Sequence, residues 1–202
     1  MAITNGYATL SELKARMGIP VSDTADDSIL EAVIEASSRS IDRYTGRQFF
    51  QSVAQTRYFT PASEVLVFVD DLLSYTAVAT DRNLDRTWSH AMAASDLELG
   101  PLNNPTVGFP YTEIRLKPLA GDSFDLGLEQ VKVTGTWGWT AVPDLINESC
   151  LLLSSRLFRR KDAPFGIAGG GDVGQSIALR GVDPDVQVLL SGYRKLALTE
   201  LV

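Results

Sequence analysis

The segment Val142–Gly174 (VPDLINESCLLLSSRLFRRKDAPFGIAGGGDVG) decides how this sequence folds. Pro143 suits the first turn of a helix, where its missing N–H would have no partner, and Asp162-Ala163-Pro164 ends that helix. The spacing predicts about five helical turns, followed by a glycine-rich loop. Because apolar residues cover more than half of the circumference, this helix is expected to pack on several sides, against copies of the same chain among others. These residues are Leu145, Ile146, Leu152, Leu153, Leu157 and Phe158.

Composition narrows the class of protein. The 202 residues are 45% hydrophobic, enough for one domain or two small ones with a real core. The single Cys150 excludes an intrachain disulfide, and its apolar surroundings predict a buried, inert thiol. A net charge of −7 argues against sequence-independent binding to nucleic acid. We expect synthesis in a cytoplasm and no membrane partner, since the sequence shows neither a signal peptide nor an apolar run of roughly 20 residues.

Two helices are expected before the first strand. Thr9-x-x-Glu12 is a capping box, and Gly18 ends the first helix. Thr24-x-x-Asp27 is a weaker version of the same start signal, before an amphipathic helix that ends at Gly46.

After Arg47 the pattern changes to short β-rich runs separated by Pro, Gly, Asn and Asp clusters, which predicts an antiparallel sandwich or barrel of about six to eight strands. The segment 102–111 reads as a long exposed loop, and 176–180 reads as a strand before a last helix that Asp183-Pro184 opens. The expected strands are Gln55–Thr60, Val65–Val69, Tyr75–Ala79, Asp96–Leu99, Glu113–Leu116 and Gln130–Thr136.

The predicted class is therefore α+β. A discontinuous helical bundle is formed by residues 1–47 and 141–202, and residues 48–140 form an inserted antiparallel β domain of sandwich or barrel type.

Candidate sites for chemistry are few. The run 169–174 fits G-x-G-x-x-G, but a basic helix precedes it and a strand follows it, so it does not have the setting of a dinucleotide site. A mobile glycine loop that orders on a partner is the better interpretation. His90 is the only histidine, which excludes a metal site built on imidazoles, and no G-x-S-x-G motif supports a triad through it. We predict no catalytic residue, no cofactor and no metal.

Trp137 and Trp139 are two residues apart on an expected strand, so they would share a face. Covering the junction between the β and helical domains is their plainer use, and a sugar- or protein-binding platform is the other. The cations at the end of the long helix suit the helix dipole and an acidic partner surface.

Several phrases, taken in order, resemble the gp6-like head–tail connector (adaptor) family of tailed bacteriophages and the related elements of gene transfer agents. The phrases are YATLSELKARMGI (7–19), DDSILEAVIEASSRSIDRYTGRQF (26–49), TRYF (56–59), VTGTWGWTAVPDLINESCLLLSSRLFRRKDAPFG (133–166) and DPDVQVLLSGYRK (183–195).

The resemblance implies a structural virion protein of the neck and not an enzyme. Such adaptors form a ring of twelve subunits beneath the portal protein, meet the tail, a stopper or a tail terminator on the other side, and let genomic DNA pass without specific binding. The residues implied in contact with the portal or a neighbouring subunit are Arg156, Arg159, Arg160, Phe165, Gly169, Gly170, Gly171, Gly174, Ile177, Leu179, Tyr193 and Arg194. The alternative is a carbohydrate- or host-surface-binding module in the β domain that uses Trp88, Tyr111, Trp137 and Trp139.

Overall fold

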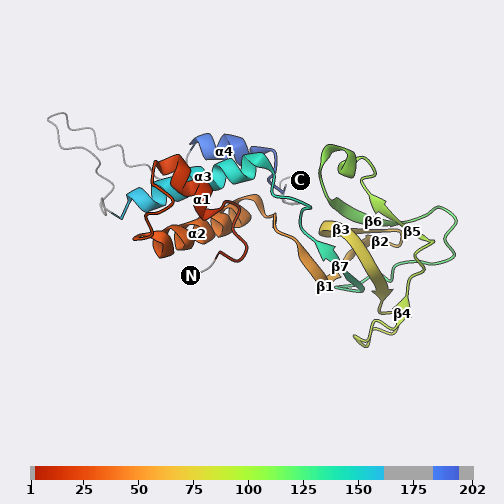
Figure 1. Cartoon of the computed structure of the whole chain (residues 1–202). Coiled ribbons are helices and arrows are strands. Elements are labelled where there is room, and N and C mark those ends of the chain that lie inside the picture. Colours follow the sequence, from red (N-terminus) through yellow and green to blue (C-terminus); the bar gives the residue numbers. More distant parts are fainter. Residues whose placement is uncertain (1–2, 162–183, 196–202) are drawn as a thin grey trace, which may run out of the picture. The chain divides into compact units, whose positions relative to one another are not determined.

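The computed structural model describes residues 3–161 and 184–195 of the chain (Figure 1). The chain forms two compact units. The helical unit contains residues 1–47 and 142–202, and the β unit contains residues 48–141. The described residues form four α-helices and a seven-stranded antiparallel sheet, which confirms the predicted α+β class.

Helices α1 (Leu10–Met17) and α2 (Asp27–Thr45) begin the helical unit. The capping box of α1 is present as predicted, since the Thr9 hydroxyl accepts a hydrogen bond from the Glu12 N–H and the Glu12 carboxylate accepts one from the Thr9 N–H. The start predicted for α2 was wrong. Asp26 is its N-cap and makes no side-chain cap bond, and its carboxylate pairs with Lys161. The Asp27 carboxylate pairs with the Lys14 ammonium.

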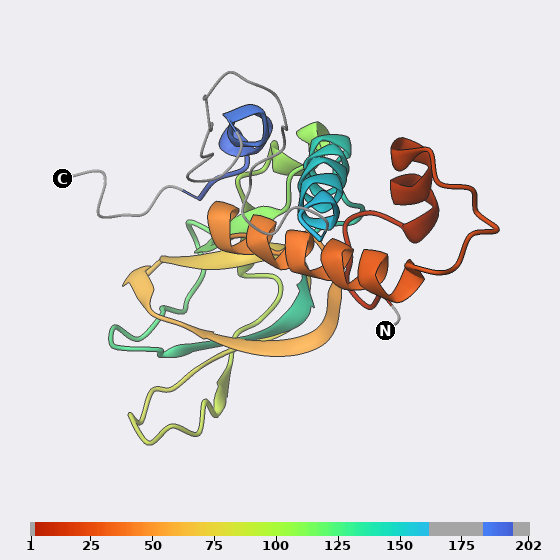
Figure 2. The same cartoon turned by 90° about the vertical axis from the view of Figure 1, so that its left-hand side faces the viewer.

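Helix α3 (Asp144–Arg159) follows Pro143 as predicted. It packs against α1, α2 and α4 (Pro184–Ser191) of the same chain, as Figures 1 and 2 show. The prediction of packing on several sides is therefore met within one chain, and packing against other copies stays a prediction. Of the apolar residues expected to pack, Leu145 and Leu157 are exposed. The buried face is instead made by Ile146, Ser149, Cys150, Leu151, Ser154 and Phe158.

The last helix is shorter than predicted, because α4 ends at Ser191 and Tyr193 lies in the turn that follows. The strand expected at 176–180 lies outside the described residues.

The sheet of the β unit has the strand order β1-β7-β3-β6-β5, with β2 and β4 also paired to β3. All pairings are antiparallel. The strands are β1 (Ser52–Phe59), β2 (Pro61–Ser63), β3 (Leu66–Thr80), β4 (His90–Ala91), β5 (Leu97–Gly100), β6 (Tyr111–Leu116) and β7 (Val131–Trp137).

Strand β3 joins two segments that the sequence predicted as separate strands. Its first half pairs with β6 and its second half with β7, and the register shifts between Phe68 and Leu72. Asp70 and Asp71, which suggested a break, lie in this irregular stretch. Both carboxylates are satisfied there, since Asp70 pairs with Arg57 at 2.9 Å and Asp71 accepts a hydrogen bond from the Trp139 indole at 3.2 Å. The half-exposed Asp70 and the buried Asp71 therefore remain inside a continuous strand.

The core of the β unit surrounds the fully buried Trp137. The segment 102–111, predicted as an exposed loop, contributes to packing as well. It contains the 3-10 helix η1 (Asn104–Val107), and the Phe109 ring contacts the Trp139 ring with centroids 5.0 Å apart.

We predict that Lys14→Met lowers the free energy of unfolding of the helical unit by about 2 kcal/mol. Lys14 is buried, and its ammonium pairs with Asp27 and donates to the Asp23 carbonyl at 2.7 Å, so the substitution leaves a carboxylate and a carbonyl without their donor. Denaturant unfolding followed by far-ultraviolet circular dichroism measures the change. Arg16→Met is the control, because it removes an exposed ion pair with Glu148 that contributes less than about 1 kcal/mol. Equal losses in the two variants would contradict the prediction.

We also predict that Gly138→Ala destabilises the β unit by at least about 2 kcal/mol. Gly138 has φ +98°, and a Cβ there would overlap the carbonyl oxygen of Phe50. All three tryptophans lie in the β unit, so their fluorescence during denaturation reports on this unit alone. Gly121→Ala, where nothing lies within 4 Å of the added Cβ, should unfold like the parent protein. If Gly138→Ala also unfolds at the same denaturant concentration as the parent protein, the prediction is contradicted.

Candidate interaction surfaces

The end of α3 carries basic and apolar side chains together. Arg159 and Arg160 are exposed and Arg156 is half-buried, while Leu157 exposes more than a third of its surface between them. The exposed Ile29 of α2 belongs to the same end, because Lys161 pairs with Asp26 at 2.8 Å. We call Ile29, Arg156, Leu157, Arg159 and Arg160 the α3-end surface. The cations suit the negative end of the helix dipole, and the exposed apolar groups favour a protein partner.

The other described residues of the predicted interface lie elsewhere. The Tyr193 carbonyl accepts a hydrogen bond from Arg47 at 2.7 Å, and the Arg194 guanidinium lies 6.0 Å from the Tyr44 ring, so both are at the end of α2 that Gly46 caps. The pKa of Tyr193 is raised by burial and by the charge of Asp144 at the start of α3. The structure therefore places Tyr193 and Arg194 at the opposite end of α3 from Arg156, Arg159 and Arg160. Phe165, Gly169, Gly170, Gly171, Gly174, Ile177 and Leu179 lie outside the described residues.

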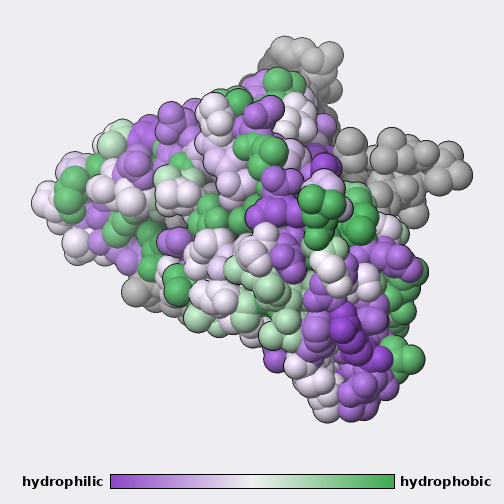
Figure 3. All heavy atoms as spheres, turned by 90° about the vertical axis from the view of Figure 1, so that its right-hand side faces the viewer, coloured by the Kyte–Doolittle hydropathy of each residue, from purple (hydrophilic) through white to green (hydrophobic). Residues whose placement is uncertain are grey.

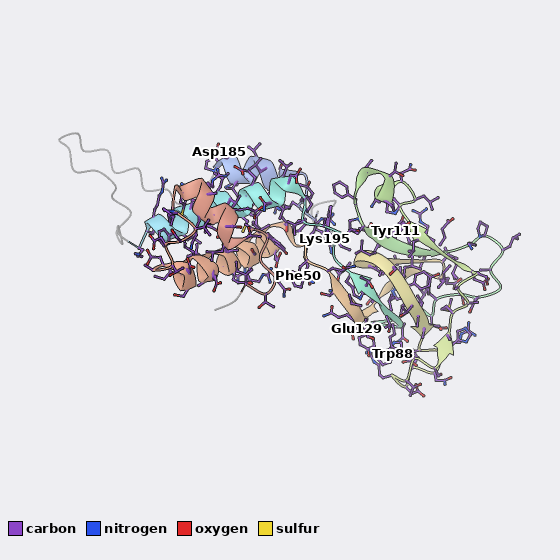
Figure 4. All side chains as sticks on the ribbon, viewed as in Figure 1. Phe50, Trp88, Tyr111, Glu129, Asp185 and Lys195 are labelled. Atoms are coloured by element: carbon purple, nitrogen blue, oxygen red, sulfur yellow. The ribbon has the colours of Figure 1, made fainter. Side chains whose placement is uncertain are left out.

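The four aromatic residues proposed for sugar binding do not form a platform. Trp137 and Trp139 are 0% and 4% exposed, and each donates its indole N–H inside the β unit, to the Gln55 carbonyl and the Asp71 carboxylate. They do not share a strand face, because β7 ends at Trp137 and the chain turns at Gly138. Figure 4 shows Trp88 and Tyr111 well apart within the β unit. The structure therefore gives the carbohydrate alternative no shared surface.

Trp88 instead belongs to a cluster that sequence reasoning missed. Its ring lies 4.6 Å from the Tyr58 ring and 5.8 Å from the Arg86 guanidinium. Its indole donates to the Glu129 carbonyl at 3.1 Å, and Arg86 pairs with the Glu129 carboxylate at 3.4 Å. Figure 4 shows Trp88 and Glu129 close together. The Asp- and Asn-rich run 81–87 was the available signal, since such runs form tight turns that hold neighbouring side chains in place.

We call this end of the β unit the tip surface. It includes three exposed leucines in the two loops that this cluster joins. Its residues are Tyr58, Leu84, Arg86, Trp88, Leu126, Leu128 and Glu129.

His90 has a structural role beside these loops. Its Nε2 lies 2.8 Å from Asp122, which also pairs with Arg82. Burial acts to raise the pKa of Asp122, but the hydrogen bonds from His90 and the Ser123 N–H and the nearby charges outweigh it and lower that pKa. The side chains that contact each other here are His90, Asp122 and Arg82, and none of them is the serine or cysteine that a triad requires. The arrangement therefore supports the loop structure.

Other chemical groups in the described residues are accounted for by structure. The Cys150 thiol is buried, and burial raises its pKa, which keeps it protonated and unreactive. A pocket of about 210 Å³ between β5 and β6 contains Glu98, Glu113 and Arg115, of which Arg115 and Glu113 pair at 2.7 Å. Residues 3–161 and 184–195 contain no group of three or more His, Cys, Asp or Glu side chains placed to hold a metal ion. Nor does any helix seen there combine the length and apolarity that a membrane crossing requires.

Comparison with known proteins agrees with the resemblance noted in the sequence. The chain is similar to a chain in the neck of an empty gene transfer agent particle computed with C6 symmetry, with 15% identity and a TM-score of 0.60 over 98% of this chain and 94% of that chain. It is also similar to a chain in the virion of a native gene transfer agent particle, with 16% identity and a TM-score of 0.54 over the same shares. These likenesses show a shared fold. No curated protein matches the chain.

A likeness to a known family comes from the sequence itself. Residues 7–95 match the family described as phage gp6-like head-tail connector protein, which is a family of structural connectors and not a class of enzymes. The later phrases that carry the resemblance, from residue 133 onward, lie beyond the matched residues. The matched residues contain α1, α2 and strands β1 to β4, and over this part of the sequence the chain is similar to phage gp6-like head–tail connector proteins.

Proposed function

We propose that this protein is a structural adaptor in the neck of a tailed-phage virion or a related particle. It is made in the host cytoplasm, forms a ring of twelve copies under the portal protein, and joins the portal to the tail, a stopper or a tail terminator. Genomic DNA passes through the ring without specific binding. The family match supports the connector role, and the chain's net charge of −7 suits a channel that DNA crosses without adhering to its wall.

The α3-end surface is the observation that carries the portal contact. It combines exposed arginines with exposed Leu157 and Ile29, although other apolar residues of α2 and α3 are buried within the unit, among them Leu30, Ile34, Ile146 and Phe158. Apolar side chains bordered by charges of one sign are typical of a surface that a complementary protein covers. The chain also enters the segment 162–183 from this end. The portal surface that meets it is therefore expected to be acidic and partly apolar.

A ring needs two different faces on every subunit, one for each neighbour. The helical unit offers exposed apolar groups away from the α3-end surface, including Leu145 at the start of α3 and Val188 on α4. Tyr193 and Arg194 follow α4, and we assign them to the contact with a neighbouring subunit. No reaction is involved in this role, since burial of protein surface between subunits supplies the strength of the joint.

We predict that Arg159→Glu/Arg160→Glu weakens binding to the portal protein of the same genome by about tenfold or more, because two attractive charge contacts become repulsive. Biolayer interferometry with the purified portal measures the affinity. Arg43→Glu/Lys117→Glu makes the same change in net charge at exposed positions outside the α3-end surface and serves as the control. If both variants lose affinity equally, net charge explains the result and the α3-end surface does not carry the contact.

Deleting Gly169–Gly174 tests the neighbouring segment, which lies outside the described residues. Its four glycines predict a loop that orders only on a partner, so the deletion is expected to leave the melting temperature unchanged and to weaken portal binding. Thermal denaturation and the same binding assay give the two readouts. Parental affinity in the deletion variant would refute the role assigned to this loop.

A further inference from the structure

Hydrogen bonds and ion pairs hold the two loops of the tip surface in one arrangement. The buried Asp81 carboxylate accepts hydrogen bonds from the backbone N–H groups of Asp85 at 3.2 Å and Arg86 at 2.8 Å. The Asp81 N–H donates to the Gln130 carbonyl at 3.0 Å, and the Glu129 N–H donates to Thr60 at 3.0 Å. The loop 81–89 and the segment before β7 therefore form one preorganised structure.

Four non-glycine residues of these loops have a positive φ, which is a strained backbone conformation. Leu84, Arg86, Trp88 and Glu129 have φ values of 58°, 64°, 45° and 56°, and only one other non-glycine residue in the described part of the chain has a positive φ. Non-glycine residues rarely adopt a positive φ, and they keep it only where surrounding contacts enforce it. Such strain gathers at sites that bind, because it fixes the direction in which side chains point.

The side chains that this backbone displays are apolar. Leu84 and Leu128 are each 69% exposed and Leu126 is 58% exposed. The aromatic groups beside them are not free to stack on a ligand, since the Trp88 ring already contacts Tyr58 and Arg86 and its N–H is bonded to Glu129. Trp88 therefore supports the loop, and the leucines form the contact. Figure 3 shows green apolar patches that interrupt the purple hydrophilic surface of the β unit.

Charge selects among the possible partners. Arg86 and Glu129 of the tip surface pair with each other, so the charge comes from the loops around them. Residues 81–90 and 121–130 contain five carboxylates and two guanidinium groups, and with the buried Asp81 left out these loops carry an excess of two negative charges. Nucleic acid and anionic membranes are repelled by such a surface. A neutral sugar would require free polar groups and an open aromatic face, and the exposed leucines offer neither. A protein surface on which apolar groups are bordered by lysine or arginine satisfies both the leucines and the carboxylates.

We propose that the tip surface docks a second, different protein of the particle through such a basic and apolar surface. This inference rests on the proposed function insofar as the chain must be part of a particle, but it adds a contact that is separate from the portal. A second copy of this chain suits the tip surface less well. The chain is acidic overall, and the basic α3-end surface is assigned to the portal.

The test uses particles produced in cells whose only copy of this protein is a variant. Leu84→Asn/Leu128→Ser makes the tip surface polar, and asparagine keeps the left-handed backbone at position 84 accessible. Leu102→Asn/Val107→Ser is the matched control, because both residues are 67% exposed and lie outside the tip surface. Quantitative mass spectrometry of the purified particles measures this chain and every other particle protein. Thermal denaturation shows that both variants fold.

We expect the tip variant to enter particles at the parental level and one other particle protein to fall by about tenfold, while the control retains all proteins. Asp85→Lys should reduce the same protein, since it places a cation against the partner's cations. The inference is overturned if every protein stays at the parental level in the tip variant. It is also overturned if this chain itself is lost, which would make a second copy the occupant. Absence of the parental chain from particles would instead refute the proposed function.

Discussion

The helical unit depends on the contact between α2 and α3, because these helices come from opposite sides of the β unit in the sequence. Small side chains make this contact. The Ser154 hydroxyl donates to Ser37 at 3.0 Å, and the Ser38 hydroxyl lies 3.4 Å from the Cys150 thiol. Small residues let two helices approach closely, and each polar group here has a partner, so burying them is not penalised. The contact joins the two parts of a discontinuous unit.

The N-terminal segment is attached to the same contact. The Ser38 hydroxyl accepts a hydrogen bond from the Tyr7 N–H at 3.0 Å, and the Asn147 amide donates to the Tyr7 carbonyl at 3.0 Å. The Tyr7 hydroxyl pairs with Asp42, whose pKa is raised by burial despite that bond. Segments from three parts of the sequence thus share one buried polar network. Such a network specifies a single packing arrangement, which a subunit of a regular assembly requires.

We assign the function to surfaces that this packing leaves exposed. Apolar side chains remain exposed at the α3-end surface and at the tip surface. The first surface is basic and the second lies among acidic loops, so the two are suited to different protein partners. That division is consistent with a connector, which has to bind one component on each side.

Local signals predicted the elements well. The Thr9 capping box, the glycines after α1 and α2 and the proline before α3 act within a few residues, so the sequence alone identified these helix ends and the α+β class. The order of its phrases also indicated the likeness to the connector family that residues 7–95 show. Long-range contacts decided the rest. Pairing with β6 and β7 carried β3 through Asp70 and Asp71, and packing on three helices of the same chain buried Ser149 and Ser154 of α3 while Leu145 stayed exposed. Local sequence patterns could not predict the tip surface either, because Tyr58, Trp88 and Glu129 come together only when β1 and β3 pair with β7. Periodicity shows which residues are apolar, but the neighbours that cover them are known only once the chain has folded.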